Sequence, residues 1–84
     1  MKTQNRANYT VTTKNGKAYK WSFTEYKSEG DYGNGIYIGV ISPSGELSSW
    51  DCRYLKGYSF NKMCIDNLLR YYGENLDELS EDEF

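Results

Sequence analysis

Apolar and polar residues alternate in four short stretches before residue 55 of the chain. These stretches are residues 9–13, 18–24, 36–41 and 47–54. Alternation with a period of two is typical of β-strands that bury one face, so the pattern predicts four strands. Turn-forming residues, Asn15-Gly16 in the first case and Ser42 to Glu46 in the second, join them into two hairpins.

The register of the first hairpin follows from which side chains must share a face. A two-residue turn at Asn15-Gly16 would place Val11 opposite Lys20, and each face of the hairpin would then mix apolar and polar side chains. A loop one residue longer instead pairs Val11 with Tyr19 and brings the apolar rows together. We therefore predict a three-residue loop with its glycine in the left-handed region.

The second hairpin is expected to close in a similar way. Pro43 suits the first central position of a turn, so Ser42 pairs with Glu46 across it. This register gives the strand pair one inward, apolar face. That face consists of Ile36, Ile38, Val40, Trp50, Cys52 and Tyr54.

A helix follows the strands. Its apolar side, read at helical spacing, consists of Phe60, Cys64, Ile65, Leu68, Leu69 and Tyr72. Ser59 is placed to cap the first turn, and Gly73 is placed to end the helix. We expect Leu76 and Leu79 to form a short further helical turn that docks back on the fold.

Together these elements predict an α+β fold with the order ββββα. Its simplest form is a four-stranded antiparallel sheet, a meander of two hairpins, with the C-terminal helix packed on one face. The chain of 84 residues is expected to be a single small domain, 1–84, whose nine Tyr, two Trp and three Phe supply the core. We expect residues 80–84 to form a mobile acidic tail.

The composition predicts a soluble protein of the cytoplasm. No apolar run is long enough to cross a membrane, and residues 1–8 lack the apolar core of a secretion signal. Cys52 and Cys64 both lie on apolar rows, so we expect two buried, reduced thiols. A disulfide between them, closing a short loop, is the alternative.

Residue patterns of the common catalytic and metal sites are missing from the sequence. The chain has no His, which removes the usual general base and the commonest metal ligand. It has no standard glycine-rich phosphate loop, and two distant cysteines do not make a structural zinc site. We therefore expect a protein that is not an enzyme and that needs no cofactor and no metal.

Charge is segregated along the chain, although the net charge is only −2. Residues 74–84 contain no Lys or Arg, and their acids are Glu74, Asp77, Glu78, Glu81, Asp82 and Glu83. Basic residues dominate positions 1–27 and include Arg6, Lys14, Lys17 and Lys20. This separation indicates an interaction surface without naming the partner.

Three surfaces are candidates for binding a partner. The outer sheet face offers the apolar residues Tyr37, Ile41 and Leu47. The predicted loop over residues 26–35 offers Tyr26 and Tyr32 among glycines, a composition found in adaptable protein-binding loops. The acidic end of the chain is the third surface. A homodimer through the outer sheet face is a further arrangement that this pattern allows.

The leading hypothesis is a small non-enzymatic protein-binding module. In its most concrete form the chain is an inhibitor or regulator of the kind found in phages and mobile elements, and thus a viral protein. It would dock on a larger protein with a basic groove, such as one that handles nucleic acid, because acidic groups can occupy such grooves.

The alternative hypothesis is a nucleic-acid-binding domain. Arg6, Lys14, Lys17 and Lys20 would then neutralise phosphates, while the outer sheet face contacts sugars or bases. The sequence pI of about 5.0 argues against it, because the acidic end would repel phosphate. Binding to nucleic acid that weakens as salt is raised would distinguish the two hypotheses.

Overall fold

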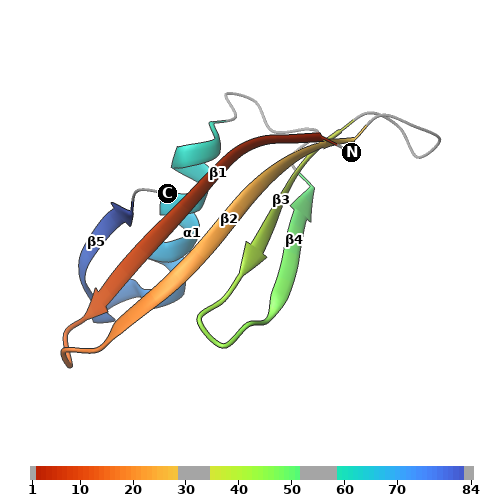
Figure 1. The fold of residues 1–84 in the computed structure, drawn as a ribbon. Coiled ribbons are helices and arrows are strands. Elements are labelled where there is room, and N and C mark those ends of the chain that lie inside the picture. The colour runs from red at the N-terminus through yellow and green to blue at the C-terminus, as the bar shows by residue number, and fades with distance from the viewer. Residues whose placement is uncertain (1, 29–34, 52–58, 83–84) are drawn as a thin grey trace.

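The computed structural model describes residues 2–28, 35–51 and 59–82 (Figure 1). The strands are β1 Lys2–Thr13, β2 Ala18–Ser28, β3 Gly35–Ile41, β4 Leu47–Asp51 and β5 Leu76–Asp82. The helix α1 spans Phe60–Tyr72, and a short 3-10 helix, η1, spans Gly73–Asn75. The fold is therefore α+β, as predicted, with one antiparallel sheet and one α-helix among these residues.

The order of the elements differs from the prediction. The sheet has five strands in the order β4-β3-β2-β1-β5, so the chain runs ββββαβ and not ββββα. The first four strands form the expected meander, and α1 then returns the chain so that β5 pairs antiparallel with β1. The expectation of four strands is wrong because Leu76–Asp82, predicted as a helical turn and the start of a mobile tail, form a fifth strand.

A bulge in β5 explains that error. Leu79 lies opposite Val11, and Leu76 lies opposite Thr13. An advance of two residues along β1 is therefore matched by three residues along β5. Asp77 is the extra residue, and it lets two leucines three positions apart point to the same face of a strand. A spacing of three between apolar residues is typical of a helix, so the sequence pattern alone predicts a helical turn here. Residues Ser80–Asp82, expected in the tail, complete β5, and residues 83–84 lie outside the described part.

The predicted registers of both hairpins are confirmed. Val11 pairs with Tyr19 and Tyr9 with Trp21, and the loop between them ends at Gly16, whose φ is 83°. In the second hairpin the Ser42 N–H donates to the Glu46 carbonyl over 3.0 Å. The requirement that apolar side chains share a face was therefore sufficient to fix both registers.

The helix begins and ends where the sequence indicates. Ser59 precedes its first residue, although the Ser59 side chain makes no capping hydrogen bond, and Gly73 follows its last residue with a φ of 55°. Phe60, Cys64 and Leu68 are buried against the sheet. Leu69, assigned to the same side from the sequence, is 46% exposed, so that assignment is wrong.

The core lies between α1 and the sheet face that α1 covers, here called the inner face. Its buried apolar residues are Ala7, Tyr9, Val11, Trp21, Phe23, Ile38, Val40, Phe60, Cys64 and Leu68. Trp50 and Ile65, which the sequence pattern also places inside, are only partly buried. Cys64 is buried, and Cys52 lies outside the described residues. Within the described part of the chain, no helix is long and apolar enough to cross a membrane.

Candidate functional site

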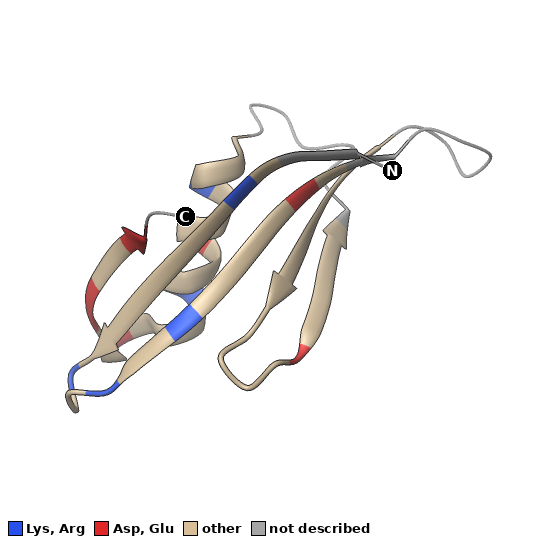
Figure 2. Ribbon diagram, in the orientation of Figure 1, with Lys and Arg blue, Asp and Glu red and all other residues tan. Residues whose placement is uncertain are grey.

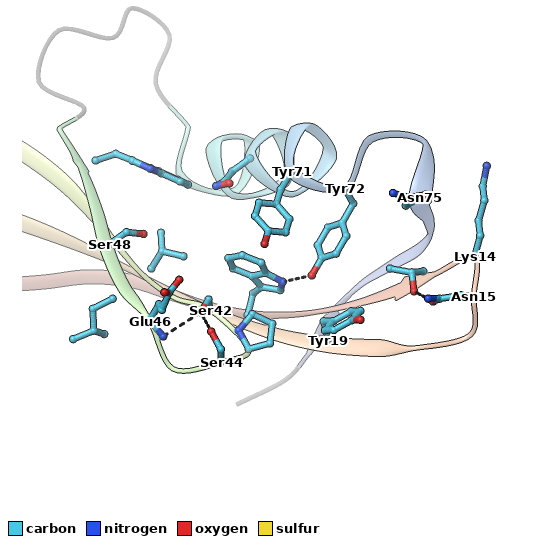
Figure 3. Close-up of a pocket in the computed structure, with 17 residues that line it drawn as sticks. Lys14, Asn15, Tyr19, Ser42, Ser44, Glu46, Ser48, Tyr71, Tyr72 and Asn75 are labelled. Atoms are coloured by element: carbon cyan, nitrogen blue, oxygen red, sulfur yellow. Dashed lines mark hydrogen bonds between the residues drawn. The ribbon is translucent and has the colours of Figure 1, made fainter.

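The helix leaves one side of the inner sheet face uncovered. Figure 1 shows α1 behind β1, with β5 to the left of the helix, while the hairpin of β3 and β4 extends to the other side. A groove of about 1300 Å³ lies between the end of α1 and this hairpin (Figure 3). We call it the aromatic groove, because five aromatic residues line it: Tyr19, Trp21, Trp50, Tyr71 and Tyr72.

The aromatic rings form a connected series across the groove. The Tyr71 ring meets the Trp21 ring edge to face, with ring centroids 5.1 Å apart. The Tyr72 ring meets the rings of Trp21 and Tyr71 in a similar edge-to-face geometry. Tyr19 approaches Tyr72 at 5.9 Å. At the other end, Phe23 links Trp21 to Trp50. Edge-to-face contacts favour fixed ring orientations, so the groove presents a preformed aromatic surface.

A hydrogen bond fixes the centre of this series. The Nε1 of Trp21 donates to the Tyr72 hydroxyl oxygen over 2.8 Å (Figure 3). Burial raises the pKa of Tyr72, while the bond from Trp21 acts in the opposite direction. Figure 3 also shows Tyr71 directed from the helix toward the sheet. Tyr71 nevertheless remains 67% exposed, so a fixed ring faces the open groove.

Polar groups surround the aromatic groove. Asn67 lines it from the helix, Asn75 from η1, and serines and Glu46 from the β3–β4 hairpin. The hairpin loop is braced, because the Ser42 side-chain oxygen accepts a hydrogen bond from the Glu46 N–H over 3.1 Å. A mixture of aromatic surface and amide or hydroxyl groups can bind the apolar side chains and the backbone of a polypeptide.

The candidate residues of the outer sheet face gather in two cross-strand pairs. Tyr26 lies opposite Tyr37, and Ile41 lies opposite Leu47. Tyr26 belongs to β2 and not to the predicted loop, while Tyr32 lies outside the described residues. Leu47 is 79% exposed, and Ile41 is also exposed. The apolar candidates of this surface that the structure describes therefore lie on β2, β3 and β4.

The acidic residues gather along one edge of the sheet (Figure 2). Glu74 lies in η1, whereas Asp77, Glu78, Glu81 and Asp82 lie in β5, and Glu83 lies outside the described residues. Asp82 is held in place, because the Thr10 hydroxyl donates to one of its carboxylate oxygens over 2.6 Å. The predicted acidic surface is thus part of the folded sheet.

The basic residues of the alternative hypothesis are spread over two places. Lys14 and Lys17 lie in the turn between β1 and β2, and Arg6 and Lys20 lie on the strands (Figure 2). Lys20 lines a small hollow of the outer face together with Asp82. An acid beside the base weakens the attraction of this hollow for phosphate.

The described residues include no group of three or more Cys, Asp or Glu side chains that could hold a metal ion. No protein-family model, no curated protein and no solved structure matches the chain. The aromatic groove was not predicted from the sequence, since Tyr71 and Tyr19 were not among the candidates. The one available signal was the Tyr71-Tyr72 pair, because adjacent helical residues cannot both face the core.

Proposed function

We propose that the chain is a non-enzymatic protein-binding module that receives a segment of a larger protein in its aromatic groove. One observation carries this proposal: Tyr71 is 67% exposed although its ring is fixed against Trp21 and Tyr72. Aromatic side chains of this kind dominate binding energy at protein interfaces. A ring already held in place loses little conformational entropy when a partner covers it.

The size of the groove favours a polypeptide over a small ligand. Its volume of about 1300 Å³ exceeds the roughly 300–1000 Å³ of typical small-molecule pockets. Side chains of β2, β4 and α1 border the groove. A segment of protein chain fits this volume and the polar rim.

The charge distribution favours a partner with a basic surface. The acids of η1 and β5 lie at one sheet edge, where they accelerate association with such a surface. An inhibitor or regulator of a protein that handles nucleic acid, as phages and mobile elements encode, has these properties. The groove supplies contact area in this proposal, and the acidic edge supplies orientation.

Capture of partners with two matched variants tests the proposal. Tyr71→Ala removes the exposed ring of the groove, whereas Leu69→Ala removes an exposed apolar side chain elsewhere on the same helix. Proteins retained from an extract of the source cell by the wild type and by Leu69→Ala, but not by Tyr71→Ala, are the expected result. Retention that is equal in all three, or that is lost after nuclease treatment, would overturn the proposal.

Nucleic-acid binding remains the second candidate because Lys14 lines the same groove as the aromatic residues. Bases stack on aromatic rings, and a neighbouring lysine neutralises phosphate. Fluorescence anisotropy with a labelled single-stranded oligonucleotide at low salt tests this candidate directly. Binding that falls in both Lys14→Ala and Tyr71→Ala, and that weakens with salt, would favour it over protein binding.

A further inference from the structure

The two edges of the sheet differ in how they are protected against pairing with another strand. Proteins commonly protect exposed sheet edges with charged residues or proline. The β5 edge contains Asp77, Glu78, Glu81 and Asp82. The β4 edge has the sequence LSSWD, with one charged residue, at its end, and no proline. No described strand pairs with the outer side of β4.

The backbone groups that β4 offers to another strand can be counted from its hairpin. The Ser42 N–H donates to the Glu46 carbonyl, which makes these two residues a hydrogen-bonded pair. Bonded and non-bonded pairs alternate in an antiparallel ladder. Leu47, Ser49 and Asp51 therefore direct their N–H and C=O groups away from β3 and toward the open edge.

We propose that β4 pairs with β4 of a second copy of this chain, antiparallel across a twofold axis at Ser49. The two five-stranded sheets then form one continuous sheet, joined through their edges and not through their outer faces. An axis at Ser49 is the arrangement that pairs all five residues of β4. It requires no change in the fold of either copy and does not depend on the proposed function.

Charge selects this pairing over the other ways of joining two copies. Pairing β5 with β5 would oppose two rows of carboxylates, and pairing β4 with β5 would bring Asp51 and Glu46 close to one row. Across an axis at Ser49, Asp51 instead lies opposite the partner's Leu47. Like charges opposite one another destabilise a strand pair, and the β4–β4 register places no two carboxylates directly opposite one another.

Side-chain size also fits this register. Trp50 is on the inner face, where it would lie opposite the small side chain of the partner's Ser48. The two Trp50 rings are then diagonal neighbours across the axis, a separation that aromatic side chains span. The acidic β5 edge prevents a further copy from adding there, so the assembly closes as a dimer.

Sedimentation equilibrium over a range of protein concentrations tests the dimer with two variants of Ser49. Ser49→Pro removes an N–H that points to the open edge and leaves the β3 pairing intact, whereas Ser49→Ala keeps that N–H. We expect a wild-type dimer that Ser49→Ala retains and whose dissociation constant rises roughly tenfold to a hundredfold in Ser49→Pro, because the twofold axis removes one bond from each copy. A monomeric wild type, or a dimer unchanged in Ser49→Pro, would overturn the proposal.

A cross-link locates the axis even where Ser49→Pro fails to fold. Directly opposite residues of a bonded antiparallel pair have Cα atoms about 5.5 Å apart, which is within reach of a short bifunctional thiol cross-linker. In a Cys52→Ser background, a short bis-maleimide should therefore join Ser49→Cys into a covalent dimer, whereas it should not join Ser80→Cys on β5. Equal cross-linking at both positions, or none at position 49, would overturn the proposed axis.

Discussion

The indole Nε1 of Trp21 lies 2.8 Å from the hydroxyl oxygen of Tyr72 and donates a hydrogen bond to it. This bond joins the first half of β2 to the last turn of α1, at the point where the covered part of the inner face ends and the groove begins. The same two residues therefore contribute to the stability of the fold and to the shape of the groove.

Tyr72→Phe should destabilise the fold by about 1 kcal/mol, because it leaves the Trp21 N–H without its partner in a largely buried place. The matched control is Tyr71→Phe, since the neighbouring ring is exposed. We expect that control to change the free energy of unfolding by less than about 0.5 kcal/mol. Urea unfolding followed by tryptophan fluorescence measures both, and equal losses would contradict the structural role of the bond.

Two adjacent leucines of α1 should respond very differently to truncation. Leu68 is fully buried against the core, whereas Leu69 is 46% exposed. Leu68→Ala should lower the free energy of unfolding by roughly 2–5 kcal/mol, enough to unfold much of a domain this small. Leu69→Ala should cost less than about 1 kcal/mol. A melting temperature unchanged by Leu68→Ala would show that α1 does not close the core.

Local features of the fold could be predicted from the sequence because local physics determines them. Gly16 and Gly45 adopt positive φ at the ends of the two hairpin loops, and Gly73 does so after the helix, where only glycine avoids strain. Matching Val11 with Tyr19 was sufficient to choose a three-residue loop over a two-residue one. These decisions need only neighbours within one hairpin or one helix.

Features that depend on distant segments could not be predicted in the same way. The bulge at Asp77 gives Leu76 and Leu79 a helical spacing within a strand, and only their pairing with β1 reveals it. The aromatic groove exists because α1 covers the β1 side of the sheet and leaves Trp50 partly exposed. The pattern of apolar residues within a single strand or helix does not show how much of the sheet the helix covers.

The hydroxyl of Tyr9 gives the fold a sensitivity to alkaline pH. It is buried and has no hydrogen-bond partner. Burial, with smaller contributions from Cys64 and Glu81, raises its pKa from 10.0 to about 12. Between these pH values the unfolded chain loses the phenol proton while the folded chain keeps it. The stability that is fully present below pH 10 should therefore fall, by roughly 2 kcal/mol, as the pH rises to 12.

Tyr9→Phe should remove this part of the pH dependence and should not destabilise the fold at neutral pH, because the lost hydroxyl was unpaired. Tyr26→Phe, on the outer face, serves as the control for the general effect of alkali. Urea unfolding at several pH values between about 9 and 12 measures the slopes. A slope in Tyr9→Phe as steep as that of the control would show that Tyr9 does not cause the effect.

Truncation after Leu79 should destabilise the folded chain, which contradicts the expectation of a loose tail. The deletion removes Ser80–Asp82 from β5, and with them the hydrogen bond that Thr10 donates to Asp82 over 2.6 Å. It also opens the β1 edge beside the buried Tyr9, which lies opposite Glu81. We expect the free energy of unfolding to fall by about 1–3 kcal/mol, since several ladder bonds and one side-chain bond are lost together.

Hydrogen exchange distinguishes this structural role from a purely electrostatic one. Amide protons of Asn8 and Thr10, which point from β1 toward β5, should exchange faster in the truncated chain, because the residues opposite them are removed, whereas those of Tyr9 and Val11 point toward β2. A Glu78→Gln, Glu81→Gln variant removes two charges but keeps the strand, and we expect it to retain the exchange rates of the wild type. If truncation left both stability and exchange unchanged, residues 80–82 would not be part of the sheet in solution. If the charge variant alone reproduced the effect of truncation, charge and not strand pairing would be what β5 contributes.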